Sequence, residues 1–468
     1  MKKRIFIVMI LILLSSVLIS FSSVASFSAG AEDEFEREDL IMIGHLTDPH
    51  FYPLNYCDAG DSTSFNREVI GATKLLVENQ MMVEQTLENI RNASFQNQTI
   101  DLDYLVVSGD ITLDGEIQSH YEISNMLREL QNLIRVNNPD FQIFCTPGNH
   151  DLHNPDAVSH KFYEQLVGKN LSINRMDFSY LYSGLGMPDY STEQLDAYYE
   201  ANQDRIIFDK LSFTPAAGKY YVSSNNASNL QFFYQIEMNK EIGEDYLPSE
   251  LSFYAADDEK EISFLCLDEE ISDEQRGHVA GGKIFDESKN WILSLPQHED
   301  YLKIAVMHHN VLPHFSMQDS ILKDFTLYKW REAADFLADL GFRYSFTGHM
   351  HAHDVISHVS YEGNPITDTQ TGSSSGYEGA VRIARIERGN VENKYAENYS
   401  SFLIKMVEAD FTRLFEESFL LTEDEASNLD EPWSYYLDFN NLRQFIEKRG
   451  NDYICLESGD YAVHKLFY

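Results

Sequence analysis

Cysteine is scarce in this sequence. Its 468 residues include four cysteines, and no two of them are spaced as C-x-x-C. Thiolate zinc sites and dithiol redox motifs need closely spaced cysteines, so the sequence supports neither. Cys145 and Cys266 lie within apolar runs typical of strands, where a small buried side chain is the expected role.

Basic residues are also few, since 35 Lys and Arg stand against 75 Asp and Glu and give a formal net charge of −40. A field of this sign repels nucleic-acid backbones and anionic membranes. We therefore expect no nucleic-acid polymer as a partner, and membrane contact only through the N-terminal segment if that segment stays uncleaved. A solvated acidic surface accounts for the charge, which says nothing about catalysis.

Long apolar runs are missing beyond the N-terminus. There, an uncharged run, Ile5–Ala31, follows three basic residues and ends in the small residues A-G-A. This order is typical of a secretory signal peptide over residues 1–31. An uncleaved anchor is the alternative, because the run is long enough to span a bilayer. In both cases we expect an exported protein that is extracellular or at the cell surface.

Short apolar runs alternate with longer amphipathic stretches over residues 40–390. The strand-like runs are 40–47, 104–109, 141–146, 261–268, 302–308 and 342–348, and the helix-like stretches are Glu68–Arg91, Ile117–Val136, Ala157–Val167 and Tyr328–Leu340. This alternation predicts a layered α/β domain. From about Asp354 onward, short alternating strands predict antiparallel pairing at one side of a mixed sheet.

Two regions depart from the alternation. Residues 170–260 are rich in Tyr, Asn and Ser and lack a clear period, which predicts an insertion lying over the core. A segment of this length is expected to have structure of its own. In residues 400–468, apolar residues recur at helical spacing over Ser401–Phe419 and near Leu442–Lys448, which predicts a small C-terminal helical cap.

Five of the strand-like runs end in residues suited to binding metal ions. These residues are Asp48 and His50, Asp110, Asn149 with His150 and Asp151, His308 and His309, and His349 and His351. In open α/β sheets, binding sites form beyond the carboxyl ends of the strands. We therefore expect five separate loops to converge on one site.

The spacing of these residues fits shared ions. Residues i and i+2 of an extended segment point to the same side, so Asp48 and His50 can aim at one ion. A carboxylate such as that of Asp110 has two oxygens and can bridge two cations. The mixture of oxygen and imidazole donors suits Mn, Fe, Zn or Co. Within the H-H pair, either His308 or His309 could be the ligand.

Taken in order, the motifs D-x-H, G-D, G-N-H-D, H-H and G-H-x-H resemble those of the calcineurin-like metallophosphoesterase superfamily. The framing segments TDPHF, VVSGDIT, TPGNHD, AVMHHN and FTGHMHAHD are most similar to those of exported bacterial members. The resemblance implies a four-layer α/β/β/α sandwich, here with an inserted segment and a C-terminal helical appendage. It also implies two divalent metal ions as cofactors and a phosphate ester as substrate.

The resemblance further implies a role for each motif residue. Asp48, His50 and His351 are expected to bind the first metal, Asp110 to bridge both, and Asn149, His308 and His349 to bind the second. His150 is not a ligand and is expected to face the substrate phosphate, where it stabilises charge or protonates the leaving oxygen. Asp151 either orients His150 or a ligand from outside the ligand shell or is an ordinary helix N-terminal residue.

These features predict hydrolysis of a phosphomonoester or phosphodiester by a hydroxide that bridges two divalent metals. The alternatives are a catalytically silent metal-binding protein and a surface-anchored scaffold protein. The natural substrate stays open, because nothing in the sequence identifies a base-stacking pocket or an acyl channel.

Overall fold

The computed structural model describes residues 40–57, 76, 78–95, 98–160, 162–206, 224–225, 227, 229–235, 251–375, 379–388, 397–405, 409–410, 455–457 and 460–462. Residues Ile41–Tyr468 form one compact unit, to which the fold described below belongs. The predicted signal segment, 1–31, lies outside the described residues. Among the helices that are described, none combines the length and apolar character needed to cross a bilayer.

One sheet of the unit has five strands in the order β14-β13-β1-β4-β5. They are β1 (Leu40–Leu46), β4 (Tyr104–Ser108), β5 (Gln142–Thr146), β13 (Ala380–Arg388) and β14 (Glu397–Lys405). The strands β1, β4 and β5 pair in parallel, and all residues of β4 and β5 are buried. Near-continuous apolar runs are typical of parallel strands that are covered on both faces.

The second sheet has seven strands in the order β11-β12-β10-β9-β8-β7-β6. They are β6 (Leu230–Tyr234), β7 (Phe253–Asp257), β8 (Ile262–Cys266), β9 (Leu302–Val306), β10 (Phe342–Thr347), β11 (Asp354–Val359) and β12 (Pro365–Gln370). The inner strands β8, β9, β10 and β12 pair in parallel, whereas β11, β7 and β6 add antiparallel pairs at the two sides. The mixed sheet predicted from the sequence is therefore present.

The two sheets pack face to face through aromatic side chains. The ring of Phe264 in β8 lies 4.7 Å from that of Tyr104 in β4 and 5.0 Å from that of Phe144 in β5, measured between centroids. The hydroxyl of Tyr104 donates a hydrogen bond of 2.6 Å to Asp257 Oδ2 across the same interface. Contacts of this kind fill the roughly 10 Å between packed sheets.

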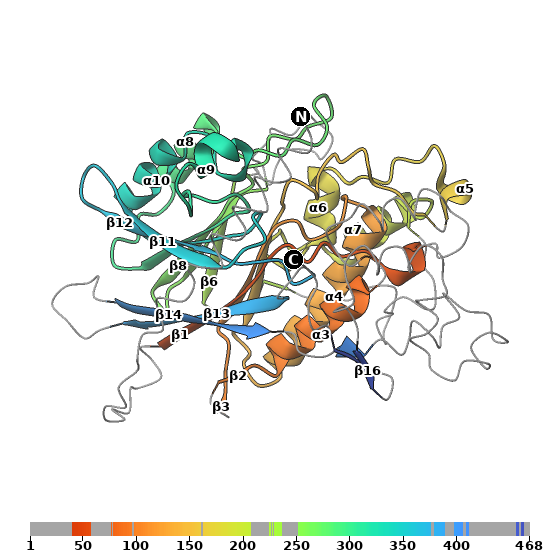
Figure 1. Ribbon diagram of the computed structural model, residues 1–468, viewed down its shortest axis with the longest axis horizontal. Coiled ribbons are helices and arrows are strands. Elements are labelled where there is room, and N and C mark those ends of the chain that lie inside the picture. Colours follow the sequence, from red (N-terminus) through yellow and green to blue (C-terminus); the bar gives the residue numbers. More distant parts are fainter. Residues whose placement is uncertain are drawn as a thin grey trace. The chain divides into compact units, whose positions relative to one another are not determined.

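Helices cover the outer faces of both sheets (Figure 1). The helices α3 (Asn79–Arg91) and α4 (Ile117–Arg135) lie on the five-stranded sheet, whereas α8 (Asp286–Ser294) and α10 (Trp330–Asp339) lie on the seven-stranded sheet. In α10 one stripe, Ala333, Ala334, Leu337 and Ala338, is buried in the core, as expected for a helix that presents one face to a sheet. The order of layers is thus α/β/β/α, which confirms the predicted fold class.

Shorter elements connect these layers. They are the 3-10 helices η2 (Leu54–Tyr56) and η3 (Lys323–Phe325), the helices α5 (Tyr163–Leu166), α6 (Arg175–Leu181), α7 (Thr192–Ala201) and α9 (Gln318–Ile321), and the strands β2 (Ser94–Phe95) and β3 (Gln98–Thr99). The helix predicted over Ala157–Val167 is confined to α5. Upstream of α5, Asn154 Oδ1 accepts from the backbone N–H of Asp156 and Ser159 Oγ accepts from that of Phe162, and such local bonds compete with helix formation.

The region predicted to be an insertion, residues 170–260, contains α6, α7, β6 and β7 in its described part. Both helices begin with a capping box, formed by Asn174 with Asp177 and by Ser191 with Gln194, which satisfies free backbone N–H groups. The strands β6 and β7 are integral to the seven-stranded sheet, and β7 is fully buried. That the rest of this region is an insertion stays a prediction.

The predicted C-terminal helical cap is wrong where the structure describes it. Residues 401–405 belong to β14, which pairs with β13 in an antiparallel register from Ala380↔Lys405 to Arg388↔Glu397. A short apolar run fits a strand as well as a helix, and here the edge of β13 provides backbone partners along its whole length. The strands β15 (Ala409–Asp410), β16 (Cys455–Glu457) and β17 (Asp460–Ala462) form a small sheet, and residues 411–454 lie outside the described residues.

The loop after β9 places a buried histidine between two carboxylates of the seven-stranded sheet. His314 Nδ1 lies 3.1 Å from Asp354 Oδ2, and Nε2 lies 3.3 Å from Asp368 Oδ2. Both nitrogens can donate only when the imidazole is protonated. Burial lowers the pKa of His314, but the hydrogen bonds to Asp354 and Asp368 outweigh it and raise the pKa to about 9.

Because the folded-state pKa of His314 lies above the unfolded value of about 6.5, its stabilisation is full below that pH and disappears as the pH rises through 9. Between pH 6.5 and 9, we expect the free energy of unfolding of the metal-free wild-type protein to fall. The fall is expected to exceed that of the His314→Gln variant by up to roughly 3 kcal/mol. Urea unfolding at a series of pH values measures the difference. If the free energy of unfolding depended on pH in the same way in both proteins, His314 would not be the group that is protonated between the two carboxylates.

Candidate metal centre

The five predicted loops follow β1, β4, β5, β9 and β10, at the carboxyl ends of parallel strands. Two groups of donor atoms form there, each with its atoms within 4.8 Å of one another: Asp48, His50, Asp110 and His351 in the first group, and Asp110, His308 and His349 in the second. Asn149 joins the second group, because its Oδ1 lies 3.0 Å from His308 Nε2. The structure therefore brings all seven predicted ligands together, with Asp110 common to both groups.

In the first group, imidazole and carboxylate atoms face one another at short range. His50 Nε2 lies 3.0 Å from His351 Nε2, which in turn lies 3.2 Å from Asp48 Oδ1. The other oxygen of Asp48, Oδ2, accepts hydrogen bonds from Thr47 Oγ1 at 2.7 Å and from the backbone N–H of His349 at 3.0 Å. These bonds fix the Asp48 carboxylate with Oδ1 towards the imidazoles.

In the second group, hydrogen bonds determine which ring nitrogens carry lone pairs. His308 Nδ1 donates to the backbone oxygen of Ser108 at 2.9 Å, and His349 Nε2 donates to that of Asp324 at 3.2 Å. In the neutral rings, His308 Nε2 and His349 Nδ1 are therefore unprotonated. These two atoms lie 3.0 Å apart, and Asp110 Oδ2 lies 3.3 Å from His308 Nε2.

Lone pairs and a carboxylate at such distances repel one another unless a proton or a metal cation lies between them. Burial lowers the pKa of His308, but the charge of Asp110 outweighs it and holds the pKa well above its usual range, so a proton takes the place of the cation in the metal-free protein. Burial alone would raise the pKa of Asp110, but the surrounding His308, His150 and His50 hold it well below its usual range, so this carboxylate stays anionic. The donors are imidazole nitrogens, carboxylate oxygens and one amide oxygen, a set that suits Mn, Fe, Zn or Co. The residues present thus fit divalent metal ions.

The backbone is strained at most of these donors. Positive φ angles occur at Asp48 (50°), His50 (43°), Asp110 (45°), His349 (67°) and His351 (52°). The left-handed region costs a non-glycine residue roughly 1–3 kcal/mol, so the surrounding contacts must hold it. Hydrogen bonds between loops do so: the N–H of Asp48 donates to Gly109 O at 3.1 Å, and that of His50 donates to Asp110 O at 3.0 Å.

Two glycines allow the loops to approach one another. A side chain at Gly148 would overlap the backbone nitrogen of Asp110, and one at Gly348 would overlap Thr47 Oγ1 and Asp48 Oδ2. The glycine positions in G-N-H-D and G-H-x-H are therefore required by close packing of one ligand loop against the next.

His150 lies beside the donor groups and belongs to neither. Its ring centroid is 5.0 Å from that of His50, and its side chain is 28% exposed. Nδ1 donates to the backbone oxygen of Leu113 at 2.7 Å, so Nε2 is the nitrogen left to meet a substrate. The backbone N–H of His150 donates to Asp110 Oδ1 at 2.8 Å, which links its position to that of the shared carboxylate.

A second imidazole near His150 was not predicted from the sequence. His278 lies 5.2 Å from His150 between ring centroids, and its Nδ1 donates to the backbone oxygen of Asn149 at 2.7 Å. It belongs to the segment ISDEQRGHVAGG, which follows no strand directly and carries no metal-ligand spacing. The sequence therefore offers no signal for its place at the site.

Asp151 joins two of the ligand loops. Its carboxylate accepts from the backbone N–H groups of Gly148 at 2.8 Å, Ile111 at 3.1 Å and Thr112 at 2.9 Å. Burial, followed by the charge of Asp110, raises the pKa of Asp151 to about 7. The hydroxyl of Thr112 and the imidazole of His120 also contact this carboxylate, at 3.2 and 3.5 Å. The backbone bonds fix the chain around Asp110 and Asn149, and none of the described contacts is with the imidazole of His150.

The two histidines of the H-H pair take different places. His308 belongs to the group around Asp110, whereas His309 lies with Glu269 and Glu270 in a third buried group. The geometry thus agrees with the choice of His308 that the resemblance implies.

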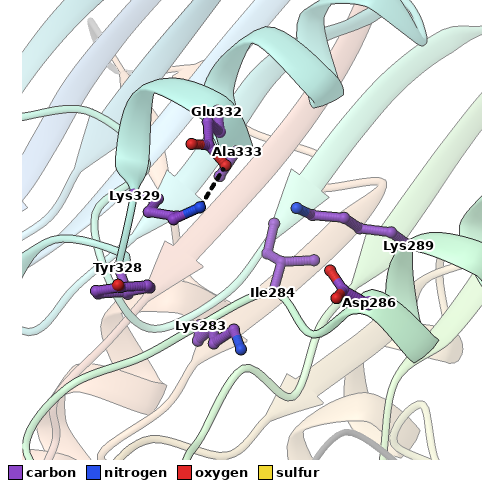
Figure 2. A pocket seen from close by; sticks show the side chains of 8 residues that line it. All are labelled: Lys283, Ile284, Asp286, Lys289, Tyr328, Lys329, Glu332 and Ala333. Carbon is purple, nitrogen blue, oxygen red and sulfur yellow. Dashed lines mark hydrogen bonds and ion pairs between the residues drawn. The ribbon is translucent and has the colours of Figure 1, made fainter.

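A surface pocket of about 140 Å³ lies elsewhere on the unit (Figure 2). Its lining comes from the start of α8, the start of α10 and the residues before each, and consists of Lys283, Ile284, Asp286, Lys289, Tyr328, Lys329, Glu332 and Ala333. Lys329 pairs with Glu332 at 3.1 Å. None of the metal donors lines this pocket, so it is distinct from the metal centre.

Replacing Gly348 by alanine tests whether loop packing maintains the centre. Since the added Cβ would overlap Thr47 and Asp48, we expect Gly348→Ala to displace Asp48 and to lose most of the bound metal. Gly281→Ala is the matched control, because its Cβ would lie 3.6 Å from its nearest neighbour, in Asp324. Elemental analysis measures the metal content of both purified variants, and thermal unfolding checks that both are folded. Wild-type metal content in Gly348→Ala would contradict the packing argument.

Comparisons with known proteins place the chain in a family. The model of the calcineurin-like phosphoesterases, Metallophos, matches residues 41–353, which is more than half of the chain and includes every predicted site residue. Comparison with curated proteins finds no match.

Solved structures similar to this chain include three that cover most of it. The phosphopantetheinyl hydrolase PptH from Mycobacterium tuberculosis is 12% identical over 72% of this chain and 91% of its own, with a TM-score of 0.27. GAP50, the anchor in the inner membrane complex of Plasmodium, is 9% identical over 85% and 94%, with a TM-score of 0.28. The 5'-nucleotidase precursor from Thermus thermophilus is 8% identical over 88% and 60%, with a TM-score of 0.33. Similarity this low carries no argument about function.

The family match therefore agrees with the geometry of the site: strand-end loops gather buried carboxylates and imidazoles that fit divalent ions. Phosphate esters are the substrates of this family. The chain belongs to the calcineurin-like phosphoesterase family and is a metal-dependent phosphoric ester hydrolase.

Proposed function

We propose that this protein hydrolyses a phosphomonoester or a phosphodiester with a hydroxide that bridges two divalent metal ions. The observation that carries the proposal is the position of Asp110 between two groups of donors. A single shared carboxylate holds two sites close enough for both to act on one phosphate. Two ions at such a distance would supply a hydroxide at neutral pH and neutralise the charge of the phosphate oxygens.

The ligands divide between the two ions in this proposal. Asp48, His50 and His351 hold the first, Asn149, His308 and His349 hold the second, and Asp110 contacts both. The support is the direction of their lone pairs: His308 and His349 both use their other ring nitrogen to donate to a backbone oxygen. Such outer hydrogen bonds orient metal-binding imidazoles in proteins.

His150 is the proposed acid of the reaction. Its Nδ1–H is held by Leu113 O, so a protonated ring would present Nε2–H towards the substrate. From that position it can donate to a phosphate oxygen or protonate the leaving oxygen. Its partial exposure keeps the ring accessible to substrate, unlike the fully buried His50 and His308.

Two substitutions separate metal binding from the chemical step. We expect Asp110→Asn to lose bound metal and most turnover, because the shared anionic ligand is gone. His150→Ala is expected to retain the metal but to lower kcat by roughly 10²–10⁴-fold, the usual contribution of a general acid. Hydrolysis of p-nitrophenyl phosphate and of its bis ester, each with Mn²⁺, and elemental analysis measure both effects.

Several results would contradict these roles. Wild-type metal content and turnover in Asp110→Asn would show that this carboxylate does not bridge. Loss of metal in His150→Ala would place that histidine among the ligands. Wild-type protein that binds two ions but hydrolyses neither ester nor any cyclic nucleotide, with Mn, Zn or Fe, would favour the catalytically silent alternative.

We further propose that the protein is exported. The support is the order of the first residues, in which a basic start precedes the uncharged run Ile5–Ala31 and a small-residue end. We expect N-terminal sequencing of the mature protein, isolated from the culture medium or the cell surface, to begin near residue 32. Full-length protein recovered with membranes would show an anchor, and recovery from the cytoplasm alone would contradict export.

A further inference from the structure

A third group of metal-binding side chains lies next to the two already described. Glu269 and Glu270 follow β8, His309 follows β9, and their donor atoms lie within 4.8 Å of one another. All three residues are at most 1% exposed. Two adjacent carboxylates removed from water this completely are costly unless a proton or a cation neutralises them, and burial, followed by the charge of Glu269, raises the pKa of Glu270 well above its usual range.

Most oxygens of the two glutamates have no hydrogen-bond partner among the described residues. These atoms are Glu269 Oε2 and both carboxylate oxygens of Glu270. The neighbouring cation, Arg175, does not bind these carboxylate oxygens. Its guanidinium instead binds Asp268 through two nitrogens, at 2.7 and 3.2 Å, and the backbone oxygens of Glu270 and Ser272. Buried carboxylate oxygens without partners are rare and require an explanation such as a bound ion.

The imidazole of His309 presents its remaining nitrogen to these oxygens. Its Nε2 donates to the backbone oxygen of Ala280 at 2.9 Å, so Nδ1 carries the lone pair in the neutral ring. This Nδ1 lies 3.2 Å from Glu269 Oε1 and 3.4 Å from Glu270 Oε1. A proton on Nδ1 or on Glu270 would compensate one of the two negative charges and would still leave buried carboxyl oxygens without a partner, whereas one divalent ion would balance both carboxylates and bind these oxygens.

We propose that Glu269, Glu270 and His309 bind a third divalent cation, separate from the pair at Asp110. The two sites share no ligand, although the ring of His309 lies 4.4 Å from that of His349. Two carboxylates and one imidazole suit Mn²⁺, Zn²⁺ or Fe²⁺.

The place of this group in the fold indicates what the third ion does. Glu269 and Glu270 lie near the start of the segment 267–285. The segment returns to His309 at Gly282, where any side chain would overlap the His309 ring. Lys283 N–H also donates to Glu269 O at 2.8 Å. The ion therefore closes this segment onto the core, and the segment carries His278, whose ring lies beside that of His150. The role of the third ion is therefore to position the imidazole of His278 at the substrate side of the metal centre.

The stoichiometry of metal binding tests the proposal. The full chain is stripped of metal, equilibrated with Mn²⁺ alone, freed of unbound ion and analysed for bound manganese. We expect three equivalents in the wild type, two in Glu270→Gln and three in Glu274→Gln, a matched change at an exposed position of the same segment. Asp110→Asn is expected to lose manganese from the pair and to retain the third ion.

A second measurement needs no variant. Diffraction data collected at the manganese absorption edge from wild-type crystals are expected to show an anomalous peak within coordination distance of His309 Nδ1. Two equivalents in both wild type and Glu270→Gln, with no such peak, would overturn the third site and leave the proposed function intact. No bound manganese in any protein would instead overturn the metal centre itself.

Discussion

The organising constraint of this molecule is the crowding of hydrogen-bond acceptor atoms, which repel one another unless a proton or a cation lies between them. Because His308 and His349 use their other ring nitrogens for hydrogen bonds to Ser108 and Asp324, His308 Nε2 and His349 Nδ1 are the nitrogens that face each other near Asp110. Nothing in a polypeptide resolves this conflict except protons or bound cations. The strained backbone, the glycines between loops and the buried Asp151 all serve to keep the donors in that arrangement.

The fold supplies the place where this arrangement can form. Parallel strands end at one edge of each sheet, so residues far apart in sequence meet without long loops. Asp110 takes the central position because β4 lies between β1 and β5. The loop after β1 then contacts it on one side through backbone bonds, and the loop after β5 contacts it on the other through His150 N–H.

Much of this was predictable from the sequence, for a physical reason. Buried parallel strands need unbroken apolar runs, so polar residues at their ends, such as Asp48 and Asn149, are conspicuous. His278 escaped prediction because it lies in an irregular segment with no period to mark it. Glu270 follows the strand-like run 261–268, but it belongs to none of the motifs D-x-H, G-D, G-N-H-D, H-H and G-H-x-H. The prediction of a helix from Ser401 was wrong because a short apolar run fits a helix and a strand equally well. Pairing with the edge of β13 makes residues 401–405 a strand.

In the proposed metal centre, the donors of each ion would come from both sheets. Asp48, His50 and Asp110 follow strands of the five-stranded sheet, whereas His308, His349 and His351 follow strands of the seven-stranded one. Each cation would thus cross-link two halves of the sandwich that otherwise adhere through side chains such as Tyr104 and Phe264. Supply of metal would then affect the stability of the sandwich as well as its chemistry, because ions that bind only the folded arrangement shift the folding equilibrium towards it.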